Sequence, residues 1–421
     1  MSSDVQFVNP SGSAQRWRVI FATFGTYLYD SYDLAILAVV MPTLLKLLNI
    51  TTTLGGLLTS ATMIGAALGS ILFGLIAENY GRKRALIIAL IWFGLGTAAI
   101  YLISSWAAWM VLRFLTGIAI GGVWGPCVAI IGRHWAPKFL ARATAFMLST
   151  FALGWILSAL AGRFVLGTDW RLLFLFGSTS VLVAALVFWL VPDDSVKRDP
   201  DKAKAAKADS VKLSELFGPG QAKLTILATL TNVCQMGGFW GIGSWIPTFL
   251  VKERGLAQTN MTYFLMLMYG GMFLGYQIFG WLGDRIGRKR AIMVCFAMDV
   301  VTIPIYLLVH NVNFLFAFGP VMGLAFGGVF GLAGAFYAEL FPERFRALGS
   351  GFCFNVGRIG AVVAPYTVGL LATHYGLATG IITAPIIFGC GLIVTAFLPE
   401  TLKRLASDKD TASVEASTAV K

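Results

Sequence analysis

Hydrophobic residues occur along this chain in long runs that short polar connections separate. Most of these runs exceed the roughly 20 residues that an α-helix needs to cross a bilayer. They cover residues 18–46, 53–78, 84–104, 107–132, 141–166, 170–192, 223–251, 260–283, 290–309, 313–339, 346–373 and 378–398. The pattern predicts an all-α membrane protein with twelve transmembrane helices.

The second half of the chain repeats the first. Residues 74–85 read GLIAENYGRKRA, and residues 280–291 read GWLGDRIGRKRA. The same spacing relates further glycines: Gly65 to Gly271, Gly69 to Gly275, Gly117 to Gly323, Gly121 to Gly327 and Gly125 to Gly331. Glycines four residues apart on one helix face let helices approach closely. The duplication predicts two pseudo-symmetric six-helix bundles with a substrate path at their seam.

Two polar stretches divide the chain. Residues 193–222 mix charges with alanine, and the C-terminal residues are rich in serine, threonine, alanine and charge. We therefore expect a cytoplasmic N-terminal segment (1–17), an N-terminal bundle (18–192), a cytoplasmic linker (193–222), a C-terminal bundle (223–398) and a cytoplasmic tail (399–421).

Composition and charge support this topology. The chain is 57% hydrophobic and 12% charged, whereas a soluble domain carries about 25% charged residues. Most of the 32 Lys and Arg lie in the termini and in the even-numbered connections, which places both termini in the cytoplasm by the positive-inside rule. The net charge of +12 is thus a topology signal, and a nucleic-acid partner is not expected. Compact loops and termini favour a bacterial inner (plasma) membrane, and we expect the protein to be a monomer.

The pattern does not indicate an enzyme. The five cysteines lie inside apolar runs without metal-ligand spacing, and the three histidines lie near the ends of runs. No nucleophile, metal cluster or phosphate-binding loop is apparent at a membrane face. We therefore expect no catalytic residue, no metal and no cofactor.

The repeated Gly-x-x-x-(Asp/Glu)-x-x-Gly-Arg-Lys-Arg sequence resembles the loop between helices 2 and 3, and 8 and 9, of the major facilitator superfamily. The sequence RFLTG at 113–117, followed by Gly121 and Gly122, resembles the helix-4 motif of that superfamily. The resemblance covers nearly the whole chain. It implies two six-helix bundles around a central cavity that work by alternating access.

The charges of the repeated loop and of a second loop suggest a gate. A carboxylate that faces a helix N-terminus gains about 0.3–1 kcal/mol when exposed, and arginines can pair with acidic groups at helix ends. The expected gating residues are Glu78, Arg82, Asp284, Arg288, Glu339 and Arg346. Alternatively, the basic cluster only fixes the topology.

Two further motifs narrow the resemblance. The sequence YDSYD at 29–33 is similar to the Asp-Gly-Phe/Tyr-Asp pattern of proton symporters for organic anions, in the aromatic-acid, sialate and short monocarboxylate branches. The sequence GFCFNVGR at 351–358 resembles the same branches. Ser31 replaces the usual glycine, and Val123 stands where the sialate-like branch often carries glutamate. These departures shift the expected proton-coupling role to the two aspartates of the first motif.

Asp30 and Asp33 lie about one turn apart, hence on one face of the first helix. In a poorly solvated cavity two carboxylates raise each other's proton affinity, and burial raises it further. We therefore expect one of them to exchange a proton during transport. Alternatively, Asp30 pairs with a cation such as Arg113 and holds helices together.

Arg358 is expected to bind a substrate carboxylate, because a guanidinium can bind a carboxylate through two parallel hydrogen bonds. A structural salt bridge is the alternative. Arg113 supplies either a second anchor or the counter-ion of Asp33. The expected substrate-binding residues are Arg358, Asn355, Gln235, Arg113, Tyr29, Trp124 and Tyr276. Asp299, in the ninth run, has no assigned role.

Together these residues predict a secondary active transporter. It would take up a small organic anion, such as an aromatic or short-chain carboxylate, with protons as its coupling partner and the lipid bilayer as its surroundings. Two arginines at membrane depth favour an anion over a cation. A proton-coupled antiporter that exports drugs or metabolites, and a membrane sensor that binds a ligand without transporting it, are the alternatives.

Overall fold

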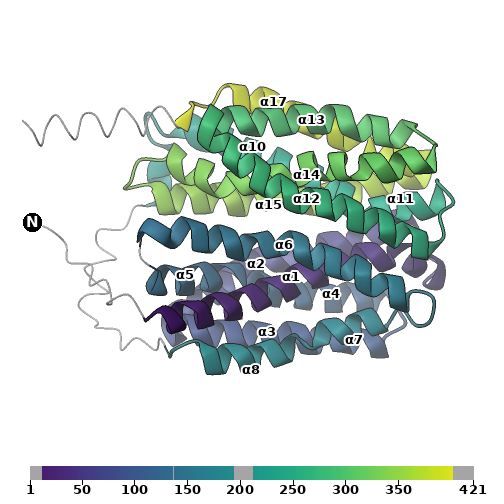
Figure 1. The fold of residues 1–421 in the computed structure, drawn as a ribbon, viewed down its shortest axis with the longest axis horizontal. Helices are drawn as coiled ribbons and strands as arrows, with labels where there is room; N and C mark the ends of the chain where they lie inside the picture. The colour runs from purple at the N-terminus through teal and green to yellow at the C-terminus, as the bar shows by residue number, and fades with distance from the viewer. Residues whose placement is uncertain (1–11, 136, 194–211, 402–421) are drawn as a thin grey trace, which may run out of the picture. The chain divides into compact units, whose positions relative to one another are not determined.

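The computed structural model describes residues 12–135, 137–193 and 212–401, which contain helices and connecting turns and no β-strand. The helices of the first half are α1 (Ser13–Leu47), α2 (Thr52–Tyr80), α3 (Arg82–Ala99), η1 (Ile100–Leu102), α4 (Trp106–Gly121), α5 (Trp124–His134), α6 (Pro137–Val165), α7 (Leu172–Ser178) and α8 (Ser180–Leu190). Those that follow are η2 (Leu213–Phe217), α10 (Ala222–Gly243), α11 (Ile246–Lys252), α12 (Gln258–Ile286), α13 (Arg288–Leu308), α14 (Val312–Leu340), α15 (Arg346–Tyr375), α16 (Leu377–Ile381) and α17 (Thr383–Ala396). The prediction of an all-α membrane fold is confirmed (Figure 1).

Each of the twelve apolar runs forms one helix or two consecutive helices. Eleven helical stretches of the described residues are long and apolar enough to cross a bilayer. The seventh run, which forms α10 and α11, is the one run that is not among these eleven stretches. Asn232 and Gln235 add polar side chains to α10, and the helix is interrupted at Trp245 before α11 begins.

The repeat is visible in the backbone. A side chain at Gly69 of α2 would overlap a carbonyl of α4, and one at Gly275 of α12 would overlap a carbonyl of α14. Gly81 and Gly287 end α2 and α12 with φ angles of 96° and 104°, which glycine adopts without steric cost. The predicted close approach of the glycine-bearing helices is confirmed in both halves.

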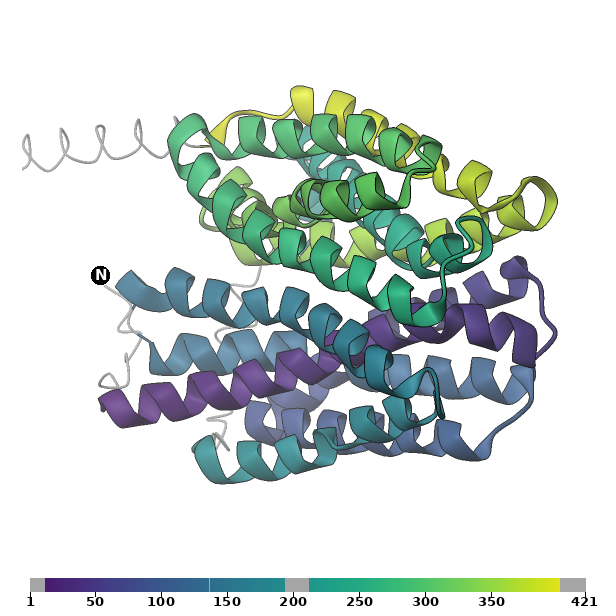
Figure 2. The ribbon, with the colours of Figure 1, turned by 45° about the vertical axis from the view of Figure 1, so that its right-hand side comes forward.

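The described helices divide into two compact units. The first unit holds α1–α8 with residues 242–269 and 365–381, and the second holds most of α10, residues 270–364 and α17. In the first unit α2 packs along α4 and α1 along α6 (Figure 2). In the second unit α13 packs against α14 and α17. The division into bundles at 18–192 and 223–398 stays a prediction, and most of the linker lies outside the described residues.

Candidate transport site

The centre of α1 carries buried polar side chains. Asp30 is 5% exposed, and Ser31 and Asp33 are fully buried. A charged side chain at the centre of a bilayer costs roughly 2.5–3.5 kcal/mol on insertion scales. Such a group is retained where a partner compensates its charge, so the neighbours of these acids decide what they can do.

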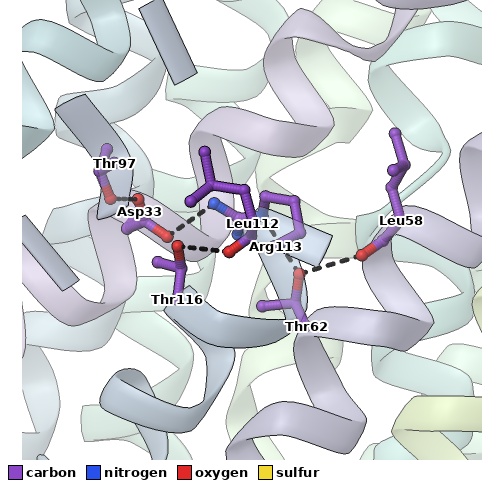
Figure 3. A network of polar contacts seen from close by, with 7 residues as sticks. All are labelled: Asp33, Leu58, Thr62, Thr97, Leu112, Arg113 and Thr116. Atoms are coloured by element: carbon purple, nitrogen blue, oxygen red, sulfur yellow. Dashed lines mark hydrogen bonds and ion pairs between the residues drawn. The ribbon is translucent and has the colours of Figure 1, made fainter. Parts of the chain in front are cut away.

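Asp33 forms a buried ion pair with Arg113 of α4. Arg113 Nη1 lies 2.9 Å from Asp33 Oδ2, and both side chains are fully buried. Thr97 of α3 donates a 2.7 Å hydrogen bond to Asp33 Oδ1. Each carboxylate oxygen therefore accepts from a different helix (Figure 3).

Arg113 is held from its other side by α2. Its Nε donates to Thr62 Oγ1 at 3.1 Å, and the Thr62 hydroxyl donates to the Leu58 carbonyl at 3.0 Å. The Arg113 Nη2 group is buried and has no hydrogen-bond partner among the described residues. The network joins α1, α2, α3 and α4 and leaves one donor group of the guanidinium unused (Figure 3).

The sequence allowed Arg113 to be either a substrate anchor or the counter-ion of Asp33. In the structure, Arg113 is the counter-ion of Asp33. Asp30 lies one turn before Asp33 and interacts electrostatically with Cys127 of α5. Which of the two aspartates carries a proton stays a prediction.

Aromatic side chains surround this part of α1. The rings of Tyr29 and Tyr32 lie 6.0 Å and 5.3 Å from the ring of Phe176 on α7. The Tyr29 hydroxyl shares a 2.8 Å hydrogen bond with Thr179 Oγ1, and the Tyr32 hydroxyl donates to the Leu173 carbonyl at 3.0 Å. The hydroxyl of Tyr29 thus has a hydrogen-bond partner within the protein.

In the second unit, Gln235 lies fully buried on α10. Its Oε1 accepts a 3.4 Å hydrogen bond from the Tyr337 hydroxyl of α14. Its Nε2 is buried without a hydrogen-bond partner in the described part of the chain. Tyr276 of α12 is 9% exposed, and its ring stacks on Phe330 at 6.3 Å. The Gln235 amide thus has one side-chain partner, Tyr337, and an unused N–H group.

Arg358 and Asn355 lie about one turn apart on α15. Arg358 is half-buried, with its guanidinium carbon 5.7 Å from the centre of the Phe354 ring. Asn355 is exposed, and its Nδ2 donates to the Gly351 carbonyl of the same helix at 2.9 Å. Trp124, the remaining residue of the expected set, is half-buried at the start of α5.

Three expected gating residues meet in the second unit. Arg288 Nη2 lies 2.5 Å from Asp284 Oδ1, and Arg288 Nε lies 3.6 Å from Glu339 Oε1. Thr401 Oγ1 donates to Glu339 Oε2 at 2.7 Å. Arg288 thereby connects the repeated loop to the end of α14, and Glu339 connects the end of α14 to the residues that follow α17.

The other expected gating residues lie differently. Glu78 and Arg346 are exposed, and neither forms an ion pair within the described residues. Arg82 is half-buried at the start of α3. The second copy of the repeated motif therefore forms ion pairs through Arg288. The first copy has no equivalent ion pair at Glu78 within the described residues.

A cluster of threonines joins α2 to α15 within the first unit. Thr52 Oγ1 donates to the Gly369 carbonyl at 2.8 Å and shares a 2.7 Å hydrogen bond with Thr373 Oγ1. Thr53 Oγ1 shares a 2.8 Å hydrogen bond with the same Thr373 hydroxyl. One turn further along α2, a side chain at Gly56 would overlap the backbone of α15. Uncharged hydrogen bonds and backbone contact therefore hold these two helix ends together.

The backbone contact at Gly56 predicts a large difference between two valine variants of α2. Gly56→Val forces α2 and α15 apart, and overpacking of this kind costs about 1–3 kcal/mol. Gly74→Val is the control, because a Cβ at Gly74 meets nothing within 4 Å. We expect thermal unfolding in detergent to begin at a lower temperature for Gly56→Val alone. Equal midpoints for the two variants would contradict the close approach.

The sequence interpretation missed the hydroxyl groups that complete these networks. Thr62, Thr97, Tyr337 and Thr373 were not among the expected residues. Thr97 lies among apolar residues in the third run, which was the available signal. Threonine in a membrane helix also packs or bonds to its own backbone, so this signal alone does not identify a partner.

Comparison with known proteins agrees with this architecture. The chain matches the family model described as Major Facilitator Superfamily over residues 23–297 and 265–420. It is 27% identical over 391 residues to the cis,cis-muconate transport protein of Acinetobacter baylyi, and the alignment covers 91% of this chain and 95% of that protein. It is 22% identical over 450 residues to the benzoate transport protein of the same organism, and that alignment covers 96% of this chain and 95% of the relative.

A solved structure supports the fold independently. A bacterial homologue of the human lysosomal transporter Spinster, in an inward-facing and unoccupied conformation, matches with a TM-score of 0.74 and 16% identity. The match covers 91% of this chain and 97% of that one. The resemblance seen in the repeated loop is therefore confirmed, as is the expectation of a transporter rather than an enzyme. This multi-pass membrane protein belongs to the major facilitator superfamily.

Proposed function

We propose that this protein is a proton-coupled symporter that takes up a small organic anion, such as an aromatic or short-chain carboxylate, by alternating access. The buried Asp33–Arg113 ion pair carries the proposal. The names of the muconate and benzoate transport proteins support a carboxylate as the substrate class. Membership of a transporter family favours transport over the sensor alternative.

Coupling follows from the electrostatics of the pair. A buried ion pair is strongly destabilised when one partner loses its charge, by about 3–5 kcal/mol when a partner is removed. Protonation of Asp33 therefore releases Arg113 from its counter-ion. The guanidinium, which already has an unused Nη2 group, then favours a second anion, so a proton and a carboxylate enter together.

The residues proposed to recognise the substrate come from both units. Arg358 binds the carboxylate, and Gln235 Nε2 and Asn355 supply hydrogen bonds. Tyr29, Trp124 and Tyr276 offer ring surfaces of the kind on which an aromatic substrate stacks, and Arg113 acts as a second anion anchor after Asp33 is protonated.

Gating and orientation complete the proposal. The ion pairs of Arg288 with Asp284 and Glu339 stabilise one conformation, and the threonine cluster holds the start of α2 to the end of α15. Glu78, Arg82 and Arg346 are proposed to engage in the other conformation. Both termini face the cytoplasm of a bacterial inner membrane, and the monomer is the transporting species.

Transport in proteoliposomes tests the proposed function. An inward proton gradient should drive accumulation of labelled benzoate or cis,cis-muconate, and a protonophore should abolish the accumulation. Labelled sugars and cationic drugs serve as comparison substrates. Proton-driven movement of a cationic drug, with no uptake of any carboxylate, would favour the antiporter alternative and contradict the proposal.

Arg358→Lys tests the carboxylate anchor. Lysine retains the charge and loses the planar pair of donors, and a hydrogen bond between charged groups contributes about 1.5–3 kcal/mol. We therefore expect KM for the carboxylate to rise about tenfold or more with the fold intact. Arg290→Lys, at an exposed position of α13, is the matched control. An unchanged KM in Arg358→Lys would assign Arg358 a structural role.

A further inference from the structure

Asp299 is a buried carboxyl group on α13 that the proposed transport mechanism does not use. Its side chain is fully buried, and neither Oδ1 nor Oδ2 has a hydrogen-bond partner among the described residues. Thr302 is 6% exposed, and its Oγ1 likewise has no partner in that part of the chain. Positions i and i+3 of a helix share a face, so these oxygen atoms belong to one polar patch inside the second unit.

The helices packed against α13 offer no cation to this patch. Within its bounds, α17 has no Asp, Glu, Lys or Arg, and Glu339 is the sole such residue of α14. Glu339 pairs with Arg288, and Arg288 lies eleven residues before Asp299, or about 16 Å along the helix. An arginine or lysine therefore does not balance Asp299 within the described residues.

Four other titratable groups that are ordinarily uncharged lie on α13, α14 and α17. Cys295 is fully buried one turn before Asp299 and interacts with it electrostatically, and Tyr306 is buried on α13 two turns after it. Tyr337 of α14 donates its hydroxyl to Gln235, and Cys390 of α17 is exposed. All four are uncharged in their ordinary protonated forms, so they do not stabilise a carboxylate by charge.

An ionised carboxylate in such a place would lose its hydration without compensation, at a cost of several kcal/mol. A protonated carboxyl is neutral and needs an acceptor for a single O–H. The candidate acceptors nearest along α13 are two oxygen atoms, neither of which is hydrogen-bonded to Asp299 in the structure. Thr302 Oγ1 is one, and the Val300 carbonyl is the other, because Pro304 has no N–H to donate to it.

We propose that Asp299 and Thr302 form a proton-binding site in the second unit, separate from the Asp33–Arg113 pair, in which the Asp299 carboxyl carries a proton at neutral pH. The site is not part of the repeat. At the spacing that relates Gly81 to Gly287, the counterpart of Asp299 is Phe93. The proposal goes beyond the proposed function, because Asp299 takes no part in binding the carboxylate or in the Arg113 pair.

Infrared difference spectroscopy of the purified full-length protein tests the proposal directly. We expect the wild-type protein at pH 7 to show the C=O stretching band of a protonated carboxyl, and Asp299→Asn to lack it. Asp33→Asn is the control and should retain the band. A wild-type spectrum from which Asp299→Asn removes only ionised carboxylate bands would overturn the proposal.

The pH dependence of unfolding gives a second measurement that does not rely on transport. Aspartate is ionised in the unfolded chain at neutral pH, so folding takes up one proton at this position. The wild-type protein should therefore lose stability relative to Asp299→Asn as pH rises, by up to tenfold in the unfolding equilibrium constant per pH unit. Thr302→Val keeps the carboxyl but removes an acceptor for its proton, so this pH dependence should persist in the variant over a narrower pH range.

Two outcomes of the stability measurement would contradict the site. One is a constant difference between the wild-type protein and Asp299→Asn from pH 5 to pH 9. The other is stabilisation of the wild-type protein, and not of Asp299→Asn, by sodium ions at fixed pH. That result would show that an alkali cation, and not a proton, binds the Asp299 carboxylate.

Discussion

Asp33→Asn is expected to abolish the accumulation of carboxylate that a proton gradient drives. Asparagine keeps the size of the side chain and an acceptor for the Thr97 hydroxyl, but it has no charge to exchange. The accumulation ratio should fall from well above one to one, because substrate can then only equilibrate. Uptake of labelled benzoate into proteoliposomes with an inward proton gradient measures this ratio.

Exchange without a gradient separates coupling from folding. Asp33→Asn should still exchange labelled for unlabelled substrate across the membrane, since that reaction requires no net proton movement. Thr97→Val, which removes the donor to Asp33 Oδ1, should weaken uphill accumulation without abolishing it. Full uphill accumulation in Asp33→Asn would remove Asp33 from the coupling role, and Asp30→Asn would then be the variant to examine.

Arg113→Met is expected to destabilise the protein strongly. It leaves the Asp33 carboxylate fully buried with the Thr97 hydroxyl as its one remaining hydrogen-bond partner among those described. Removal of one partner from a buried pair costs about 3–5 kcal/mol. The midpoint of thermal unfolding in detergent should fall accordingly, together with the yield of folded protein.

A double variant identifies the reason for that loss. Asp33→Asn combined with Arg113→Met removes both charges, and replacement of a whole buried pair by uncharged side chains is often close to neutral. We therefore expect the double variant to unfold at a higher temperature than Arg113→Met alone. If the two variants are equally unstable, the loss comes from packing around Arg113 and not from an uncompensated charge.

The fold could be predicted from the sequence because its signals are long and repeated. Each apolar run is longer than chance would produce, and two copies of one loop sequence are not expected by chance. Gly69 and Gly275 occupy equivalent positions, and both lie against a neighbouring backbone. The sequence was therefore sufficient to predict the helices, the repeat and the close helix pairs. It did not predict the interruptions within helices, such as the one at Trp245.

The candidate site was only partly accessible. The sequence places Asp30 and Asp33 on one face of a helix, but the rotation of α1 against α3 and α4 decides which of them meets Arg113. That rotation depends on the packing of several helices together. The hydroxyl partners Thr62 and Thr97 could not be selected either, because threonine serves packing and hydrogen bonding equally well.

The asymmetry of the gates has a similar origin. The two copies of the loop share the segment GRKRA and an acidic residue before it, Glu78 in the first and Asp284 in the second. The network around Arg288 also requires Glu339 and Thr401, which come from distant parts of the chain. A short motif specifies the turn and the charges, and the tertiary fold determines which charges meet.

Proton movement that the substrate itself induces is the most direct measure of coupling through Asp33. Proteoliposomes are prepared in weak buffer without a pH gradient, and benzoate or cis,cis-muconate is added outside while a dye reports the external pH. We expect the wild-type protein to make the outside more alkaline as substrate enters, and Asp33→Asn to make no such change. Substrate entry without alkalinisation in the wild-type protein, or equal alkalinisation in Asp33→Asn, would contradict this coupling.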